Sequence, residues 1–399
     1  MSDNHRRYRS IRTALAQMYL KEPRGYKAKQ LNVLAALISG IVGSRKTNYP
    51  QIASKVPDHT KVESRVKRFS RYINEVEEAQ IHLMPFAAEL LTNLANFTLV
   101  LIMDGSEVGR GCVSLRVSVQ YRGRALPLGW LVVAGEKGHF SQGKHIQLLS
   151  AVKELLPASA DVIFLGDGEF DGVQLQEKLD EFGWKYACRT SSNIILYDGE
   201  EFSFQDLVLQ PGMCLSIAEV AFTRQRDGPV LALAWWRKNY HEPIYLVSNF
   251  DLVDEVCHWY QRRFKIETFF SDQKSRGFHL HKSHLSNPQR LAKLMLAACL
   301  AYLWIVYLGV HAIQKNFLPM IHRSDRCDLS LFQLGLRLLE HLLDFHPYAV
   351  KTASSSRLWA RSSQRGCALP FNFFILTGLR VGSTHFAITT RSRPSRLAR

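Results

Sequence analysis

The chain has 399 residues, enough for two or three domains with a sizeable core, and 46% of them are apolar, which excludes an intrinsically disordered polymer. Its formal net charge is +16. A charge of this size favours a polyanionic partner, with nucleic acid ahead of an acidic membrane surface, although charge also serves solubility alone.

Seven cysteines are spread along the chain, and no two of them form a CxxC pair. An odd count without such pairs argues against a disulfide framework and against a structural zinc site. The N-terminus is basic and lacks an apolar run, so it does not predict a signal peptide. A reducing cytosol is the compartment that these features favour.

Residues 1–90 predict a helical region. An apolar stripe predicts a first helix, and two shorter helices are expected at 48–56 and 61–73. Thr60 is the expected N-cap of the helix at 61–73, because Glu63 follows three positions later and would complete a capping box.

Basic charge is concentrated in this same region. Up to Arg71 the chain holds 16 Lys or Arg against 4 Asp or Glu. Two short helices, the second of them basic, resemble a helix-turn-helix that places a helix against DNA. A solvated basic face is the alternative. The side chains expected to contact DNA are Lys61, Arg65 and Arg68.

The character of the chain changes after residue 95, where apolar and alternating runs predict strands. A meander of three strands followed by alternating helices and strands is the order of the ribonuclease H fold. We therefore expect an α/β fold with a mixed sheet and flanking helices, in a core made of residues 95–193 and 249–315. The predicted elements are strands at 97–103, 113–121 and 125–134, a helix at 142–156, a strand at 162–165, a helix at 173–182 and a strand at 184–188.

Residues 194–248 are rich in strand patterns and turn signals, and they predict a β-rich insertion in this core. A long amphipathic helix is expected at 251–278. The uncharged run at 294–310 is nearly long enough to span a bilayer, but it stands alone, so a buried core helix is favoured. The last predicted parts are a helical region at 316–345 and a basic, poorly ordered tail at 346–399.

Two aspartates follow predicted strands of the core. Asp104 is expected to end the first strand, and Asp167 follows the fourth. If those strands are neighbours, both carboxylates emerge at the same edge of the sheet. Carboxylates placed in this way suit two Mg²⁺ ions, roughly 4 Å apart, on either side of one phosphate. An Asp after a strand is often only a turn residue, so the pair alone is a weak signal.

A third acid lies on the predicted helix at 251–278. Tyr260, Arg263, Glu267 and Lys274 share one face of this helix at about 100° per residue. Such a row is costly to bury without a partner but suits a phosphate, which Arg263 grips bidentately and Lys274 attracts as a point charge. Glu267 is the expected third metal ligand. The alternative is a solvated helix in which Arg263 and Glu267 form an i,i+4 pair.

These residues resemble the DDE transposases, in the insertion-sequence branch of IS-four type that carries a Y-x2-R-x3-E-x6-K signature. The four side chains of the predicted helix face match that signature without a gap. Asp104 in Met-Asp-Gly-Ser matches the first catalytic position, and Asp167 the second. Gly168 departs from the pattern, because the family usually has Arg there. The resemblance covers about residues 30–340.

The resemblance implies a transposase that moves an insertion sequence by metal-dependent DNA cleavage and strand transfer. Asp104, Asp167 and Glu267 are its implied catalytic residues, with two Mg²⁺ ions, for which Mn²⁺ can substitute. The implied partners are double-stranded DNA, as terminal inverted repeats and as target, and a second copy of the chain in a homodimeric synaptic complex, with no membrane. The implied location is the cytoplasm of a bacterium or archaeon, in association with the nucleoid.

Further DNA contacts are implied outside the helix face. Arg189 falls where the family often has a DNA-contacting arginine. Trp235 and Trp236 in the insertion are candidates to hold a flipped base, the alternative being that they belong to the core.

Two other functions stay open at this point. One is a ribonuclease H-like nuclease that hydrolyses without joining, against which the helix face and the basic N-terminal region argue. The other is a decayed transposase that only binds DNA, against which the three intact acids argue.

Overall fold

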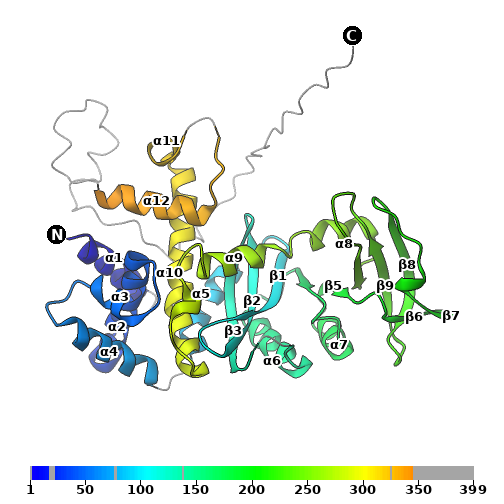
Figure 1. Cartoon of the computed structure of the whole chain (residues 1–399), viewed down its shortest axis with the longest axis horizontal. Coiled ribbons are helices and arrows are strands. Elements are labelled where there is room, and N and C mark those ends of the chain that lie inside the picture. The colour runs from blue at the N-terminus through cyan, green and yellow to red at the C-terminus, as the bar shows by residue number, and fades with distance from the viewer. Residues whose placement is uncertain (1, 18–22, 76–78, 137–138, 324–325, 345–399) are drawn as a thin grey trace, which may run out of the picture.

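A mixed sheet of ten strands runs through the computed structural model, which describes residues 2–17, 23–75, 79–136, 139–323 and 326–344 (Figure 1). The strand order is β3-β2-β1-β4-β5-β10-β9-β8-β6-β7. Helices flank the sheet, so the predicted α/β class with a mixed sheet is confirmed. The predicted tail at 346–399 lies outside the described residues.

The first half of the sheet has the strand order expected of a ribonuclease H-like core. Strands β1, β2 and β3 form an antiparallel meander, and β4 and β5 continue parallel to β1. Arg122 and Gly123 join β2 to β3 with φ of 43° and 76°, which is the backbone that a two-residue hairpin turn needs. The strands and helices of this half are β1 (Leu99–Glu107), β2 (Cys112–Tyr121), β3 (Arg124–Ala134), α6 (Gln142–Lys153), β4 (Val162–Gly166), α7 (Val173–Glu181) and β5 (Lys185–Thr190).

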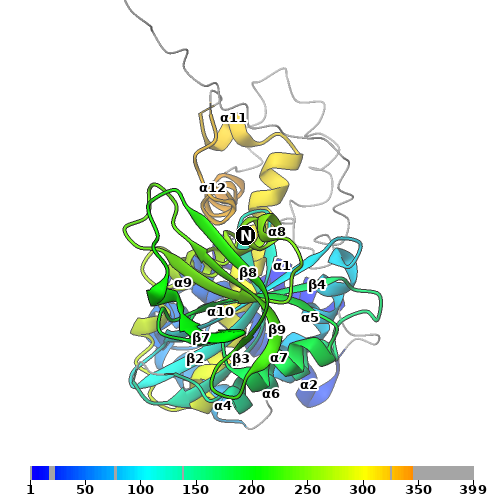
Figure 2. The same cartoon turned by 90° about the vertical axis from the view of Figure 1, so that its right-hand side faces the viewer.

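The strands of residues 194–248 extend this sheet instead of forming a β-unit of their own. Strand β10 pairs antiparallel with β5 on one side and with β9 on the other. Figure 2 shows these outer strands in front of the core strands. The elements are β6 (Ile195–Asp198), β7 (Glu200–Ser203), the short helix η1 (Phe204–Asp206), β8 (Cys214–Phe222), β9 (Asp227–Trp235) and β10 (Ile244–Ser248).

Helices cover the two faces of the core differently. On β3, Gly129 faces Leu148 of α6, whereas the next residue, Trp130, donates from its indole nitrogen to the Ala292 carbonyl of α10 at 3.3 Å. Helix α6 therefore lies on one face and α10 on the other. The helices of this second face and beyond are α8 (Val253–Tyr260), α9 (Lys265–Gln273), η2 (Leu280–Lys282), α10 (Pro288–Gln314), α11 (Leu318–Ile321) and α12 (Leu331–Asp344).

Helix α10 is the uncharged segment whose length raised the question of a membrane span. Among the described residues it is the one helix long and apolar enough to cross a bilayer, but 94% of its most apolar window is buried inside the protein. The prediction of a buried core helix is confirmed. In Figure 1, α10 stands between the N-terminal helices and the sheet, and it contacts α2 as well as β3.

The N-terminal region is helical, as predicted, but the N-cap predicted for the helix at 61–73 is wrong. Lys61, not Thr60, is the N-cap of α4, and it makes no side-chain capping bond. The Thr60 amide instead donates to the Asp58 carboxylate at 2.7 Å, which ends the preceding turn. The helices are α1 (Asp3–Gln17), α2 (Gly25–Ser44), α3 (Tyr49–Ser54), α4 (Val62–Asn74) and α5 (Ala79–Leu94).

Two of the arginines expected to contact DNA hold this turn together. Arg65 donates to the carbonyl oxygens of Ala53 at 2.8 Å and Val56 at 3.2 Å. Arg68 forms an ion pair with Asp58 at 2.5 Å. Lys61, the N-cap of α4, is exposed. The guanidinium groups of Arg65 and Arg68 thus have structural partners inside the region.

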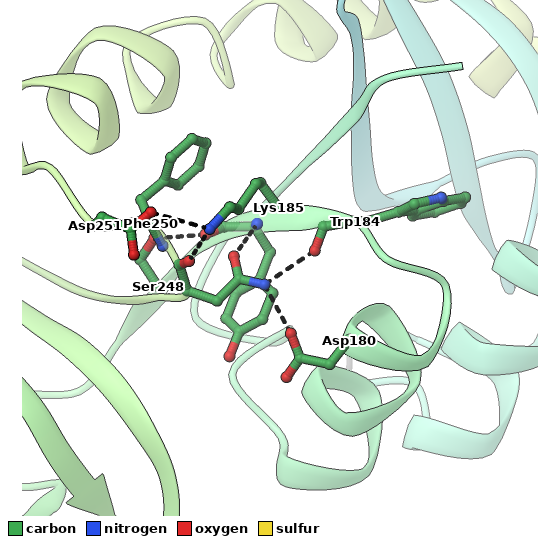
Figure 3. A network of polar contacts seen from close by, with 8 residues as sticks. Asp180, Trp184, Lys185, Ser248, Phe250 and Asp251 are labelled. Atoms are coloured by element: carbon green, nitrogen blue, oxygen red, sulfur yellow. Dashed lines mark hydrogen bonds and ion pairs between the residues drawn. The ribbon is translucent and has the colours of Figure 1, made fainter. Parts of the chain in front are cut away.

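A polar network joins the exit of the outer strands to the core (Figure 3). The Asn249 amide oxygen accepts from the Tyr186 backbone at 2.7 Å, and its nitrogen donates to Asp180 at 2.7 Å and to the Trp184 carbonyl at 3.0 Å. Lys185 donates to the Asn249 carbonyl at 2.7 Å. These bonds fix the end of β10 against β5 and so set where the chain enters α8.

We expect Asn249→Ala to lower the free energy of unfolding by about 1–3 kcal/mol, because the Tyr186 amide and the Trp184 carbonyl lose their partner. The urea midpoint of the purified chain measures this. Asn193→Ala is the matched control, because Asn193 is exposed in a turn. Equal midpoints for the two variants would contradict the role given to Asn249.

Candidate active site

Two aspartates are brought together by the register of neighbouring parallel strands. Strands β1 and β4 advance in step from the pair Leu99–Val162 to the pair Ile102–Leu165. Two residues further along the chain from that last pair come Asp104, still within β1, and Asp167, the first residue after β4. Asp104 does not end its strand as predicted, since β1 stays paired with β2 as far as Glu107. The expectation that both carboxylates meet at one edge of the core is confirmed.

Asp104 is in an environment that favours added positive charge. Its side chain is only 16% exposed, and the nearest cation is Arg263, with Nη1 3.7 Å from Oδ2. Burial and then the charge of Asp167 raise the pKa of Asp104 to about 7, although Arg263 opposes this. Two carboxylates that repel each other in a partly desolvated position suit a hard divalent cation.

The two aspartates open into a cavity of about 670 Å³. Lys274 reaches the same cavity from the end of α9, and His139 and Glu169 line its other side. The remaining lining residues are Gly105, Ser106, Glu107, Val113 and Gly168.

The segment Asp167–Asp171 uses its other two acids as tethers. Glu169 accepts from the Phe140 amide at 2.5 Å and contacts Nε2 of the buried His145 at 3.1 Å. Burial opposes these bonds, but together with His139 they lower the pKa of Glu169. Asp171 accepts from the Thr190 hydroxyl at 2.7 Å on β5. The backbone that carries Asp167 is therefore tied to the start of α6 and to β5.

The long helix predicted at 251–278 is broken. Helix α8 ends at Tyr260 and α9 begins at Lys265. Between them the backbone forms hydrogen bonds from residue i to residue i−3, such as that from the Arg263 amide to the Tyr260 carbonyl at 3.0 Å. Such bonds belong to a tighter, 3₁₀-type turn. The prediction that Tyr260, Arg263, Glu267 and Lys274 share one face of a continuous helix is therefore wrong.

The four side chains of that predicted face nevertheless gather at the site. Tyr260 is buried, and burial raises its pKa while the nearby Arg263 and Arg189 lower it. Arg263 is buried between two acids, 3.7 Å from Asp104 and 3.4 Å from Glu267. Glu267 is about half exposed, and Lys274 lines the cavity. The turn at 261–264 keeps these groups on the side of Asp104.

Glu267 does not form a three-acid group with the two aspartates. Among the described residues, no three His, Cys, Asp or Glu side chains are arranged to hold a metal ion. The reason is that Arg263 lies between Asp104 and Glu267 and pairs with both. In this structure the carboxylates that fit a divalent cation are Asp104 and Asp167, and Glu267 is held apart by an arginine.

The other predicted DNA contacts lie on or beyond β5. Arg189 is partly exposed and pairs with Glu242 at 3.2 Å. Trp236 donates to the Tyr240 carbonyl at 3.0 Å and is half-buried, whereas Trp235 packs against the hydrophobic core. Of the two tryptophans, Trp235 therefore matches the alternative of a core residue.

With this geometry in place, the comparison with known families decides the class. The transposase DDE domain family matches residues 97–304, just over half of the chain, from the strand of Asp104 to the middle of α10. The chain belongs to the DDE transposase family. The matched segment includes all three predicted catalytic acids of this transposase.

Comparisons with individual proteins add little. No curated protein matches the sequence of this transposase. A cryo-EM structure of the piggyBac transposase in a synaptic complex with hairpin DNA is similar, with a TM-score of 0.45 and 12% sequence identity over 92% of this chain and 83% of that chain.

Arg116 is a buried residue of the site that the sequence did not identify. It is directly opposite Asp104 on β2 and 1% exposed, and two of its guanidinium nitrogens have no hydrogen-bond partner in the structure. The guanidinium lies over Phe269 at 5.4 Å and Phe270 at 5.1 Å, both on α9. A charge in the middle of an otherwise uncharged strand was the available signal.

We expect Arg116→Met to leave the free energy of unfolding unchanged or to raise it, by up to about 2 kcal/mol. The methionine keeps the packing under α9 and removes a fully desolvated charge, and that desolvation cost outweighs the attraction of Asp104, the bond to Ser114 and the contacts with the rings. Urea unfolding of the transposase measures the difference.

Arg124→Met is the matched control with the opposite expected sign. Arg124 pairs at 2.9 Å with Asp272, whose side chain is 5% exposed. Removing one partner of a buried pair is expected to cost about 3 kcal/mol or more. If Arg116→Met destabilises the protein as much as Arg124→Met, the guanidinium of Arg116 has a structural role that these contacts do not explain.

Proposed function

We propose that this chain is an insertion-sequence transposase of IS-four type that cuts the ends of its element and joins them to target DNA. The observation that carries the proposal is that the parallel strands β1 and β4 bring Asp104 and Asp167, the residue after β4, to one cavity that Lys274 also lines. The segment that runs from Tyr260 to Lys274 also fits the Y-R-E-K signature of that branch.

The cofactor in this proposal is Mg²⁺, with Mn²⁺ as a substitute. Asp104 and Asp167 would hold it, because their mutual repulsion and partial burial suit a divalent cation. When bound, a pair of such ions supplies charge to the phosphate oxygens and a nucleophilic oxygen at neutral pH. Glu169 and Asp171 act on the site only by fixing the backbone of Asp167.

Arg263 has a central part in this proposal. In the absence of DNA it neutralises both Asp104 and Glu267. A DNA phosphate competes for the same guanidinium, which grips phosphates bidentately. Glu267, already about half exposed, is then released from its arginine and becomes available as the third acid. Lys274 adds charge at the cavity, and the buried Tyr260 lies near Arg263.

Outside the cavity, the proposed partners are the terminal inverted repeats and the target DNA, bound by a homodimer. The N-terminal helices are the proposed end-binding region, with Lys61 as a phosphate contact and Arg68 reaching DNA only if it leaves Asp58. Arg189 and Trp236 are proposed contacts beside the catalytic edge. Because α2 packs on α10, deleting the N-terminal helices would expose core surface, so single substitutions test this region better.

We expect Glu267→Gln to retain binding to the element's ends and to lose cleavage with Mg²⁺ by more than about 100-fold. The basis is that even outer-shell partners of a metal site are worth about 10–100-fold. Glu255→Gln on α8 is the control, since Glu255 is exposed and belongs to the preceding helix. Normal cleavage by the Glu267 variant would remove it from the catalytic set.

Strand transfer distinguishes the proposed function from its two alternatives. A labelled element end is incubated with plasmid DNA and Mg²⁺, and we expect the label to become joined to the plasmid. Cleavage without joining would indicate a ribonuclease H-like nuclease. Binding without cleavage would indicate a decayed, DNA-binding relative.

A further inference from the structure

The two longest stretches without an acidic residue in the described part of the chain lie far apart in the sequence. They are residues 23–57, which include α2 and α3, and residues 273–324, which begin at the end of α9. The chain as a whole has 35 acids, so two such stretches are long intervals of uncompensated positive charge. They come from the N-terminal helices and from the far end of the catalytic region.

The fold brings these two stretches into contact. The hydroxyl of the buried Thr47, in the loop between α2 and α3, donates to the His279 carbonyl at 3.1 Å. The rings of His279 and His281 lie 5.9 Å apart. Burial lowers the pKa of both histidines, and Lys46 and Lys282 lower it further, so the two lysines converge on this place from different elements.

The same surface is continuous with the catalytic cavity. The His279 amide donates to the Lys274 carbonyl at 2.8 Å, and Lys274 lines the cavity that holds both aspartates. The backbone between Lys274 and His279 packs tightly against the end of α9, because a Cβ atom on Gly277 would lie only 1.8 Å from the Asp272 carbonyl oxygen. We call the series Lys274, His279, His281, Lys282 and Lys46 the basic strip.

We infer that the basic strip binds the phosphate backbone of the DNA duplex next to the phosphate that is cut. This inference rests on the proposed function for its choice of partner. Duplex DNA carries one negative charge per about 1.7 Å of its axis, so a duplex leaving the cavity presents phosphates along the strip. One end of the strip is at Lys274 in the catalytic cavity and the other is at Lys46 beside α2.

Apart from Lys274, the residues of the strip differ from the DNA-binding side chains that the sequence suggested on α4. Arg65 and Arg68 of α4 are held by carbonyl groups and by Asp58. His281 and Lys282 are exposed, and Lys46 is half-buried. The strip places its cations where a single duplex reaches both the N-terminal helices and the catalytic cavity.

The test is the salt dependence of binding to a short fluorescent duplex of random sequence, measured by anisotropy. For the double variant Lys46→Ala, Lys282→Ala we expect weaker binding. The slope of log affinity against log salt should fall by about 0.9 for each lysine. The loss should be equal for any duplex sequence, because phosphates carry no base identity.

The control is the double variant Lys153→Ala, Lys178→Ala, which removes the same charge from α6 and α7. Helix α6 lies on the other face of the core sheet, so this variant should leave the slope unchanged. The charge reversal Lys282→Glu, at an exposed position, guards against effects of folding and should weaken binding more than Lys282→Ala does. Urea midpoints confirm that the variants fold.

The outcomes separate the strip from the proposed function. An unchanged slope in a protein that still cleaves element ends with Mg²⁺ overturns the strip and leaves the transposase function standing. A lower slope in a protein that never cleaves supports the strip as a DNA contact and counts against the catalytic proposal. If the strip variant and the Lys153, Lys178 control lose the same amount of slope, the effect comes from net charge alone and the proposal that the basic strip binds DNA is overturned.

Discussion

The repulsion between Asp104 and Asp167 is the constraint on which the rest of the site depends. Parallel pairing of β1 and β4 brings the two carboxylates together, and the bonds of Glu169 and Asp171 hold the loop that carries Asp167. Arg263 is the cation that contacts Asp104. The cost of holding two acids together is met by the core beneath them, where α10 is almost completely buried.

The core strands and the aspartate pair were predictable because their signals are local. Apolar runs and the order of five strands predicted the ribonuclease H order, in which the two aspartates meet if the first and fourth strands are neighbours. The break at 261–264 was not predictable, since that segment has neither proline nor glycine. The turn places Arg263 against Asp104, a tertiary contact that helical periodicity does not include. The pairing of β10 with β5 was not predicted either, because it too is a contact between segments distant in the sequence.

Charge was harder to interpret than hydrophobicity. The sequence showed where basic residues are concentrated but not which of them have partners within the fold. Asp58 accepts a hydrogen bond from the Thr60 amide and forms an ion pair with Arg68. The first contact explains why Thr60 is not the N-cap of α4, and the second gives Arg68, a predicted DNA contact, a partner within the fold. Arg116 shows the reverse, because the alternation of its strand predicts an exposed polar face and the structure buries it. In both cases the partner, or its absence, is decided by distant parts of the chain.

The contact of α2 with α10, and of α10 with β3, has a consequence for how this protein changes over evolutionary time. The N-terminal helices and the catalytic strands share one continuous hydrophobic core, from Ile11 to Leu343. A new N-terminal region acquired by recombination would have to match the surface of α10 as well as its DNA. Recognition of new element ends is therefore expected to arise by point substitutions on exposed positions, and not by exchange of a detachable module.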